Sequence, residues 1–265
     1  GNEQCQNHNR PKANGKGSFS DIMKNIPDLL RLFPNTTFRS TLTPYTVDKI
    51  MENYFFVQDL GFKHYFLIPN ECESWTEEQK IMMTYQMGIM MEYFYESVSN
   101  KIEPLYFSPI MKCFENLLQS NGIEKNVHRC GLGTTSVGIS IDGKICGCQE
   151  YSSYIEEKDL FYIGDVFTGI NKNKHLFLLN NYLENEHIQS QKQQCNENNC
   201  ICYNYCNKNH CPSKNFTLYK NMNINSDIIC HWKKICYTIA ETLLERAAKE
   251  NNIAFQQYLQ YYFPK

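Results

Sequence analysis

Cysteine constrains this chain more than any other residue, because nine of its thirteen cysteines lie between positions 130 and 230. The total is odd, and the density is below the roughly 8–10% that marks a small disulfide scaffold. The chain opens with a polar segment and not with a secretion signal, so we expect reduced thiols. Reduced thiols that cluster in sequence usually ligate metal.

Composition excludes several classes of partner. The 265 residues are 42% hydrophobic, and 26 basic residues nearly balance 28 acidic ones for a net charge of -2. Such a balance lacks the excess of positive charge that binding to nucleic acid or to an acidic membrane surface requires. No run approaches the roughly 18 apolar residues of a membrane span. We therefore expect a soluble protein, and the first residue, Gly1, suggests that an N-terminal part is missing.

The first 120 residues alternate between helical and strand patterns. Helices are predicted over residues 19–33, from Thr46 to Gly61, and after Ser74, where Glu77 completes a capping box. A further helix over residues 101–119 carries Cys113 as a buried core thiol. Strands are predicted over residues 36–42 and 64–68. This alternation predicts an α/β layer of parallel strands, with two or three units, too few to close a barrel.

The remaining residues have a different character. Residues 136–148 alternate around Asp142-Gly143, a strong signal for a β-hairpin. A strand or turn is predicted over residues 161–167, a helix over residues 169–187, and two closing helices over residues 232–249 and 253–263. The run CNENNCICYNYCNKNHC, residues 195–211, is too polar for regular structure. Loops of this kind suit cubane iron–sulfur clusters, which need four converging thiolates and free backbone amides.

The order of the cysteines resembles the SPASM extension of radical S-adenosylmethionine enzymes. That pattern is a cysteine, a Gly-x4-Cys element, a packed run of four cysteines and a final cysteine. Seven positions match in order, namely Cys130, Cys148 after Gly143, Cys195, Cys200, Cys206, Cys211 and Cys230. The packed run here is C-x4-C-x5-C-x4-C, so two of its loops are longer than the C-x2-C-x5-C-x3-C usual in the family.

The resemblance implies two auxiliary 4Fe-4S clusters. Cys195, Cys200, Cys206 and Cys230 would ligate an outer cluster. Cys130, Cys148 and Cys211 would hold an inner one that lacks a fourth ligand. Its open iron could take a substrate thiolate, or Cys146 or Cys202 could fill it.

Residues 2–35 resemble the segment that follows the fourth strand of the family's catalytic barrel. His8 and Arg10 fit an H-x-x-R-like element there, and Arg10 would then bind the S-adenosylmethionine cofactor; the alternative is a solvated loop arginine. The resemblance implies an α/β fold in which residues 1–120 form the second half of a partial (β/α)6 barrel and residues 121–265 a SPASM domain. The C-x3-C-x2-C motif of a third 4Fe-4S cluster is absent, so this chain alone is expected to be inactive.

The activity implied is that of a cytoplasmic peptide maturase. Such an enzyme cleaves S-adenosylmethionine reductively, abstracts hydrogen from a cysteine-containing precursor peptide and forms a thioether-type crosslink. It would take electrons from a donor such as a ferredoxin or flavodoxin.

Three alternatives stay open. The first is formylglycine formation in a sulfatase, although Gln149 stands where such enzymes have an aspartate base and leaves Glu150 as a weak catalytic candidate. The second is a non-catalytic electron-transfer or peptide-docking module. The third is a zinc-binding interaction domain using Cys200, Cys202, Cys206, His210 and Cys211.

Overall fold

The computed structural model describes residues 1–118, 130–152, 158–183, 195, 199–205, 211–222, 224 and 226–264. The chain divides into two compact units. One comprises Gly1–Asn121 together with Cys230–Lys265, and the other Gly122–Ile229. We had expected the second domain to continue to residue 265, whereas the residues from Cys230 onward pack with the first unit. The second unit is therefore an insertion in the chain of the first.

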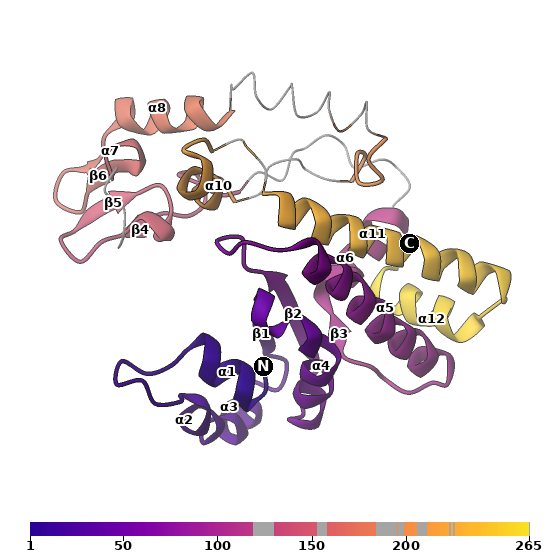
Figure 1. Cartoon of the computed structure of the whole chain (residues 1–265). Coiled ribbons are helices and arrows are strands. Elements are labelled where there is room, and N and C mark those ends of the chain that lie inside the picture. Colours follow the sequence, from indigo (N-terminus) through magenta and orange to yellow (C-terminus); the bar gives the residue numbers. More distant parts are fainter. Residues whose placement is uncertain are drawn as a thin grey trace. The chain divides into compact units, whose positions relative to one another are not determined.

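The first unit contains a three-stranded parallel sheet in the order β1-β2-β3 (Figure 1). Its strands are β1 (Thr37–Leu42), β2 (His64–Pro69) and β3 (Tyr106–Phe107). Phe38 is in register with Tyr65, and His64 with Tyr106. The mixed α/β class and the first two strands are confirmed. The third strand replaces the start of the helix predicted over residues 101–119, because two residues are too short for a periodic pattern to reveal.

Helices follow each strand of this sheet. They are η1 (Pro44–Lys49) and α4 (Ile50–Asp59) after β1, α5 (Glu77–Ser99) after β2, and α6 (Ser108–Leu118) after β3. The capping box predicted at Ser74 and Glu77 lies two residues further on. Thr76 accepts a hydrogen bond from the Gln79 amide, and the Gln79 side chain accepts one from the Thr76 amide.

Three short helices precede the sheet, namely α1 (Glu3–Asn9), α2 (Phe19–Met23) and α3 (Ile26–Leu32). A single helix over residues 19–33 was therefore wrong. Pro27 occupies the first turn of α3. A proline has no amide hydrogen and its ring clashes with the preceding turn, so the helical pattern cannot run through it.

One face of the sheet forms the core of the first unit. Tyr65, Leu67 and Phe107 are 2% exposed or less, and Met83, Met87 and Met90 of α5 are fully buried. The closing helices α11 (Asp227–Lys249) and α12 (Ile253–Tyr262) lie beside α5 (Figure 1).

Contacts between side chains hold α11 and α12 on α5. Phe255 of α12 is buried and its ring packs against the rings of Phe94, Tyr95 and Phe114. The Arg246 guanidinium on α11 donates hydrogen bonds of 2.8 Å to the carboxylates of Glu92, Glu96 and Glu250.

The second unit contains an antiparallel sheet in the order β4-β5-β6-β7. Its strands are β4 (Gly138–Ile139), β5 (Lys144–Cys146), β6 (Tyr162–Asp165) and β7 (Gly169–Ile170). The predicted hairpin is confirmed, since β4 and β5 pair around Gly143, whose φ is +81°. Its helices are η2 (Gln149–Tyr151), α7 (Lys158–Phe161), α8 (Lys172–Leu183) and α10 (Pro212–Tyr219). The helix predicted from residue 169 begins at Lys172 because β7 precedes it.

A separate core stabilises the second unit. It consists of Leu132, Cys146, Tyr151, Phe161, Ile163, Leu178 and Met222. Among the helices that the structure describes, none has the length and apolar composition of a membrane span.

Candidate functional site

The cysteines of the second unit are the first candidate site. None of the twelve cysteines within the described residues forms a disulfide. Cys130 is exposed, whereas Cys148, Cys195, Cys200 and Cys211 are half-buried. Most of these thiols are therefore partly shielded from solvent, as metal ligands usually are.

A backbone hydrogen bond joins the segments that carry Cys130 and Cys148. The Gly133 amide donates to the Gly147 carbonyl at 2.7 Å, and the Gly147 amide donates to Phe161 at 2.8 Å. A side chain at position 147 would collide with Leu178. Glycine at position 147 therefore leaves room for the Leu178 side chain beside the point where the loop after Cys130 meets the chain before Cys148.

Tyr151 connects the Cys148 segment to the Cys211 segment. Its amide donates to the Cys148 carbonyl at 3.1 Å, and its hydroxyl donates to the Ser213 carbonyl at 2.8 Å. Burial of the phenol raises the pKa of Tyr151, and negative charge on Cys211 and Cys148 raises it further. Both thiols thus lie within electrostatic reach of one phenol.

Cys211 is the N-cap residue of α10, and Pro212 follows it in the first turn. Proline fits that turn because its missing amide hydrogen would have no partner there. The Asn215 amide donates to the Cys211 carbonyl at 2.9 Å. The positive end of a helix dipole stabilises a negatively charged ligand at this position. A thiolate at Cys211 is therefore in a favourable electrostatic environment.

Fewer contacts are described for the other predicted ligands. Cys195 and Cys200 are linked by a 2.9 Å hydrogen bond from the Cys200 amide to the Cys195 carbonyl. Cys206 and His210 lie outside the described residues. Cys230 lies on α11 and is half-buried. Across the described part of the chain, no group of three cysteine, histidine or acidic side chains converges closely enough to hold a metal ion.

The two spare cysteines are buried. Cys146 is 2% exposed and belongs to the core of the second unit, and its thiol donates to the Tyr151 carbonyl at 3.5 Å. Cys202 is also 2% exposed. Both thiols are thus shielded from solvent, and their role as a fourth ligand stays a prediction.

Glu150, the weak catalytic candidate, lies in η2 beside Cys148. Its carboxylate is 3.5 Å from the Lys214 ammonium, and both side chains are partly exposed. This pair is a second contact between η2 and α10. A role for Glu150 as a base stays a prediction.

A second candidate site is the carboxyl edge of the parallel sheet, where α/β proteins bind their ligands. Arg10 is exposed and follows α1 directly. Its neighbour Asn9 accepts a 3.2 Å hydrogen bond from the hydroxyl of Thr43, the residue after β1. His8 stacks on Tyr45 with ring centroids 3.6 Å apart. These contacts place Arg10 at the carboxyl end of β1.

The loop after β2 lies at the same edge. The Asn70 amide donates to the Leu42 carbonyl at 2.7 Å, and the Trp75 indole donates to the Asn70 carbonyl at 2.9 Å. Cys72 in this loop is exposed. Sequence reasoning did not single out this loop, although a polar segment directly after a strand of a parallel sheet was a usable signal.

The sheet face opposite the core carries polar and aromatic side chains. Thr37, Arg39 and Thr41 of β1 alternate as exposed residues with buried or half-buried ones. The Arg39 guanidinium lies 5.7 Å from the Phe66 ring centroid. Parallel sheets are normally covered on both faces, so a partly open face is suited to binding a ligand or another protein segment.

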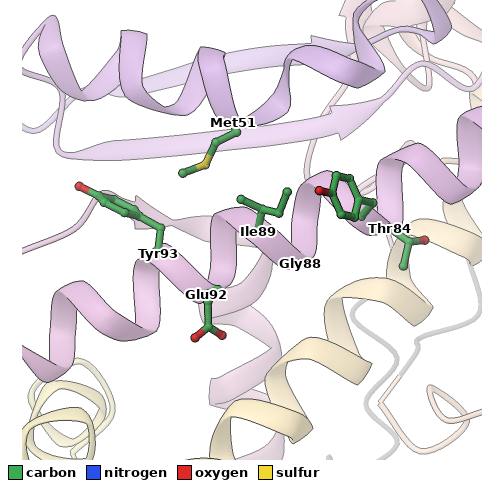
Figure 2. Close-up of a pocket in the computed structure, with 7 residues that line it drawn as sticks. Met51, Thr84, Gly88, Ile89, Glu92 and Tyr93 are labelled. Carbon is green, nitrogen blue, oxygen red and sulfur yellow. The ribbon is translucent and has the colours of Figure 1, made fainter.

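An apolar groove of about 580 Å³ lies between α4 and α5 (Figure 2). Met51 of α4 lines one side. The residues that line it from α5 are Thr84, Tyr85, Gly88, Ile89, Glu92 and Tyr93. Glu92 is paired with Arg246. The groove therefore lacks the convergent polar groups that a catalytic pocket needs.

Comparison with known proteins adds evidence on the fold. No family model matches the chain, and neither does any curated protein. Solved structures do match, with TM-scores of 0.61–0.62: anSMEcpe, an anaerobic sulfatase-maturating enzyme of the radical S-adenosylmethionine type, in a histidine-tagged form with bound AdoMet, in its native form with AdoMet, and with AdoMet and a Kp18Cys peptide.

The sequence identity to these structures is 14%, 15% and 14%, and each match covers 94% of this chain. This chain spans 64% of the first of these proteins and 67% of the other two. At such identity the likeness concerns the fold. The chain thus has a fold similar to that of a radical S-adenosylmethionine enzyme.

Proposed function

We propose that this chain forms part of a radical S-adenosylmethionine enzyme that modifies a peptide, with the second unit as a SPASM-type domain that holds two auxiliary clusters. One observation carries the proposal. Within a fold similar to that of AdoMet-bound enzymes, the segments bearing Cys130, Cys148 and Cys211 are joined by hydrogen bonds through Gly147 and Tyr151.

The residue types suit the inner iron–sulfur cluster that we propose. Thiolate is the ligand that such clusters require, and the three cysteines come from a loop, the N-cap of η2 and the N-cap of α10. Three ligands leave one position open for a fourth. A substrate thiolate is a suitable fourth ligand, because Cys146 is committed to the core. The chain's own part is to present three thiolates and to exclude solvent from one side.

Cys195, Cys200, Cys206 and Cys230 are the ligands that we propose for an outer cluster. The 2.9 Å hydrogen bond from the Cys200 amide to the Cys195 carbonyl supports a common role for those two residues. The C-x4-C-x5-C-x4-C spacing supports the inclusion of Cys206.

The first unit is proposed as half of a partial (β/α)6 barrel, with its carboxyl edge facing S-adenosylmethionine. Arg10 would neutralise the cofactor carboxylate by a charge-assisted hydrogen bond. In the whole enzyme, C-x3-C-x2-C cysteines outside this chain would hold a third cluster, which would supply the reducing chemistry for S-adenosylmethionine, with a ferredoxin or flavodoxin as electron donor.

The reaction that we favour is formation of a thioether-type crosslink in a cysteine-containing precursor peptide. Formylglycine formation is the second candidate, because the similar structures are sulfatase-maturating enzymes. Gln149 argues against it, since an amide cannot accept a proton at neutral pH. Glu150, the adjacent carboxylate, is paired with Lys214.

The test is anaerobic reconstitution of the full-length protein, followed by iron and sulfide analysis. Three 4Fe-4S clusters in the full-length protein require about twelve irons, about eight of them on this chain, and Cys206→Ala should remove about four. Colourless protein with stoichiometric zinc and no sulfide would instead support the zinc-binding alternative. Mass spectrometry of a treated Kp18Cys peptide separates the two reactions, because a thioether keeps the sulfur and formylglycine loses it.

A further inference from the structure

Tyr151 is the largest polar side chain in the core of the second unit, and its ring is fixed by packing. It is fully buried, and it stacks on Phe161 with centroids 3.4 Å apart and planes 8° from parallel. Phe216 of α10 meets the Phe161 ring at 5.1 Å and 72°. The Tyr151 phenol is therefore directed by aromatic neighbours and has little freedom to turn.

The hydrogen bonds of Tyr151 reach both proposed ligand segments. Its amide bonds to the Cys148 carbonyl, three residues back along the chain. Its hydroxyl bonds to Ser213, which is two residues beyond Cys211 and 62 residues away in sequence. Two hydrogen bonds of Tyr151, one from its amide and one from its hydroxyl, thus connect Cys148 to the first turn of α10.

The Ser213 carbonyl does not depend on Tyr151 for a partner. The Thr217 hydroxyl also donates to it, at 3.0 Å. Loss of the phenol hydroxyl therefore leaves no buried carbonyl without a donor, which is the usual cause of a large folding penalty. The role of the Tyr151 hydroxyl is therefore to fix the position of α10 relative to the hairpin, because the Ser213 carbonyl has a second hydrogen-bond donor.

We infer that Tyr151 is a positioning residue for the proposed inner centre, because it ties the segment after the hairpin to α10 and so keeps the Cys148 segment beside the Cys211 segment. The inference rests on the proposed inner cluster and deepens it. Tyr151 touches neither iron nor substrate in this role. It acts through the two cysteines, as outer-shell partners of metal ligands do.

The experiment is anaerobic titration of the metal-free full-length protein with Co²⁺, read by the thiolate-to-cobalt charge-transfer absorption. Tyr151→Phe keeps the ring and its stack but removes the hydroxyl. We expect the Co²⁺ affinity to fall roughly tenfold or more, the range typical of outer-shell changes. Tyr162→Phe, which removes a hydroxyl from β6 in the same unit, should change the affinity less than twofold.

A double-mutant cycle tests whether Tyr151 acts through the cysteines. In a Cys211→Ser background, Tyr151→Phe should cause little further loss of affinity. Equal Co²⁺ affinity and equal absorption for the wild type and a folded Tyr151→Phe variant would overturn the inference but leave the proposed cluster intact. Absence of thiolate absorption in the wild type would overturn both. A Tyr151→Phe variant that does not fold by circular dichroism would show a purely structural role and overturn the inference alone.

Discussion

The Gly133 amide donates a 2.7 Å hydrogen bond to the Gly147 carbonyl, and this bond is the contact that brings the exposed Cys130 segment to the hairpin. It forms between two residues without side chains. The close approach of two backbones therefore contributes to this side of the candidate metal centre, together with the His175 ring, which hydrogen-bonds to the Gly133 carbonyl.

Gly147→Ala is expected to damage the centre without touching any cysteine. The new methyl group would collide with the end of the Leu178 side chain, which is fully buried and must shift within the core to admit it. Overpacking of this kind costs about 1–3 kcal/mol of unfolding free energy. Urea denaturation should show that loss, and reconstitution should retain less iron. Gly88→Ala is the control, because nothing lies within 4 Å of a methyl group there and alanine favours a helix.

Two cysteines of the first unit should differ sharply in reactivity. Burial raises the pKa of the Cys113 thiol to about 12, and this thiol donates to the Pro109 carbonyl at 3.3 Å. Cys72 is exposed. Because the thiolate is the reactive form, iodoacetamide at pH 8 should label Cys72 and spare Cys113 in the native protein. Peptide mapping reads the result, and both cysteines should react equally in urea. Rapid native labelling of Cys113 would contradict the fold described for α6.

Arg246→Met should loosen the attachment of α11 to α5. The guanidinium contacts three carboxylates and lies 4.2 Å from the Tyr95 ring centroid. These groups are partly exposed, so we expect a loss of about 1 kcal/mol, somewhat more than for an isolated surface pair. Urea denaturation at low salt measures it, and 1 M salt should shrink the difference. Arg31→Met is the control, since Arg31 makes a single exposed ion pair with Asp28.

The same network predicts a dependence of stability on pH. The hydrogen bond from Arg246 is the main cause that lowers the pKa of Glu250 from 4.5. A carboxyl whose pKa is lower in the folded state adds stability above its unfolded pKa, and that stability disappears as the pH falls through the folded value. The wild type should therefore lose its advantage over Arg246→Met below about pH 4.5. A constant difference between pH 7 and pH 3 would contradict this account.

Arg10→Ala tests the carboxyl edge of the sheet. Loss of one charge-assisted hydrogen bond should weaken binding of S-adenosylmethionine by roughly tenfold or more. Equilibrium dialysis with the full-length protein measures the change. Arg39→Ala is the comparison, because Arg39 lies on the open face of the same sheet. A loss of binding in Arg10→Ala alone would assign the binding site to the carboxyl edge and not to that face. Unchanged binding in Arg10→Ala would favour the alternative of a solvated loop arginine.

Local patterns were sufficient to predict β1, β2 and the β4–β5 hairpin, because the first two are six residues long and rich in β-branched or aromatic side chains and the hairpin has an Asp-Gly turn. The same patterns failed at Pro27, which divides a predicted helix, and at Tyr106–Phe107, whose strand exists only through pairing with β2. Local rules carry no information about such long-range partners.

The candidate site shows the same limit. The resemblance to the SPASM pattern implied that Cys148 and Cys211 share a cluster, which stays a prediction. The structure links their segments through Tyr151, a residue that no motif marked. Cys146, the alternative ligand, lies among Leu132, Phe161 and Leu178 in the core. The sequence shows which residues could be ligands, but it does not show which surrounding residues position those ligands.

The insertion of the second unit into the first has a practical consequence for protein production. Truncation after residue 121 would remove Phe255 and expose the rings of Phe94, Tyr95 and Phe114 that it covers. Such a truncated product should aggregate during expression. A soluble version of the first unit instead calls for internal excision, in which a short linker joins the end of α6 directly to α11.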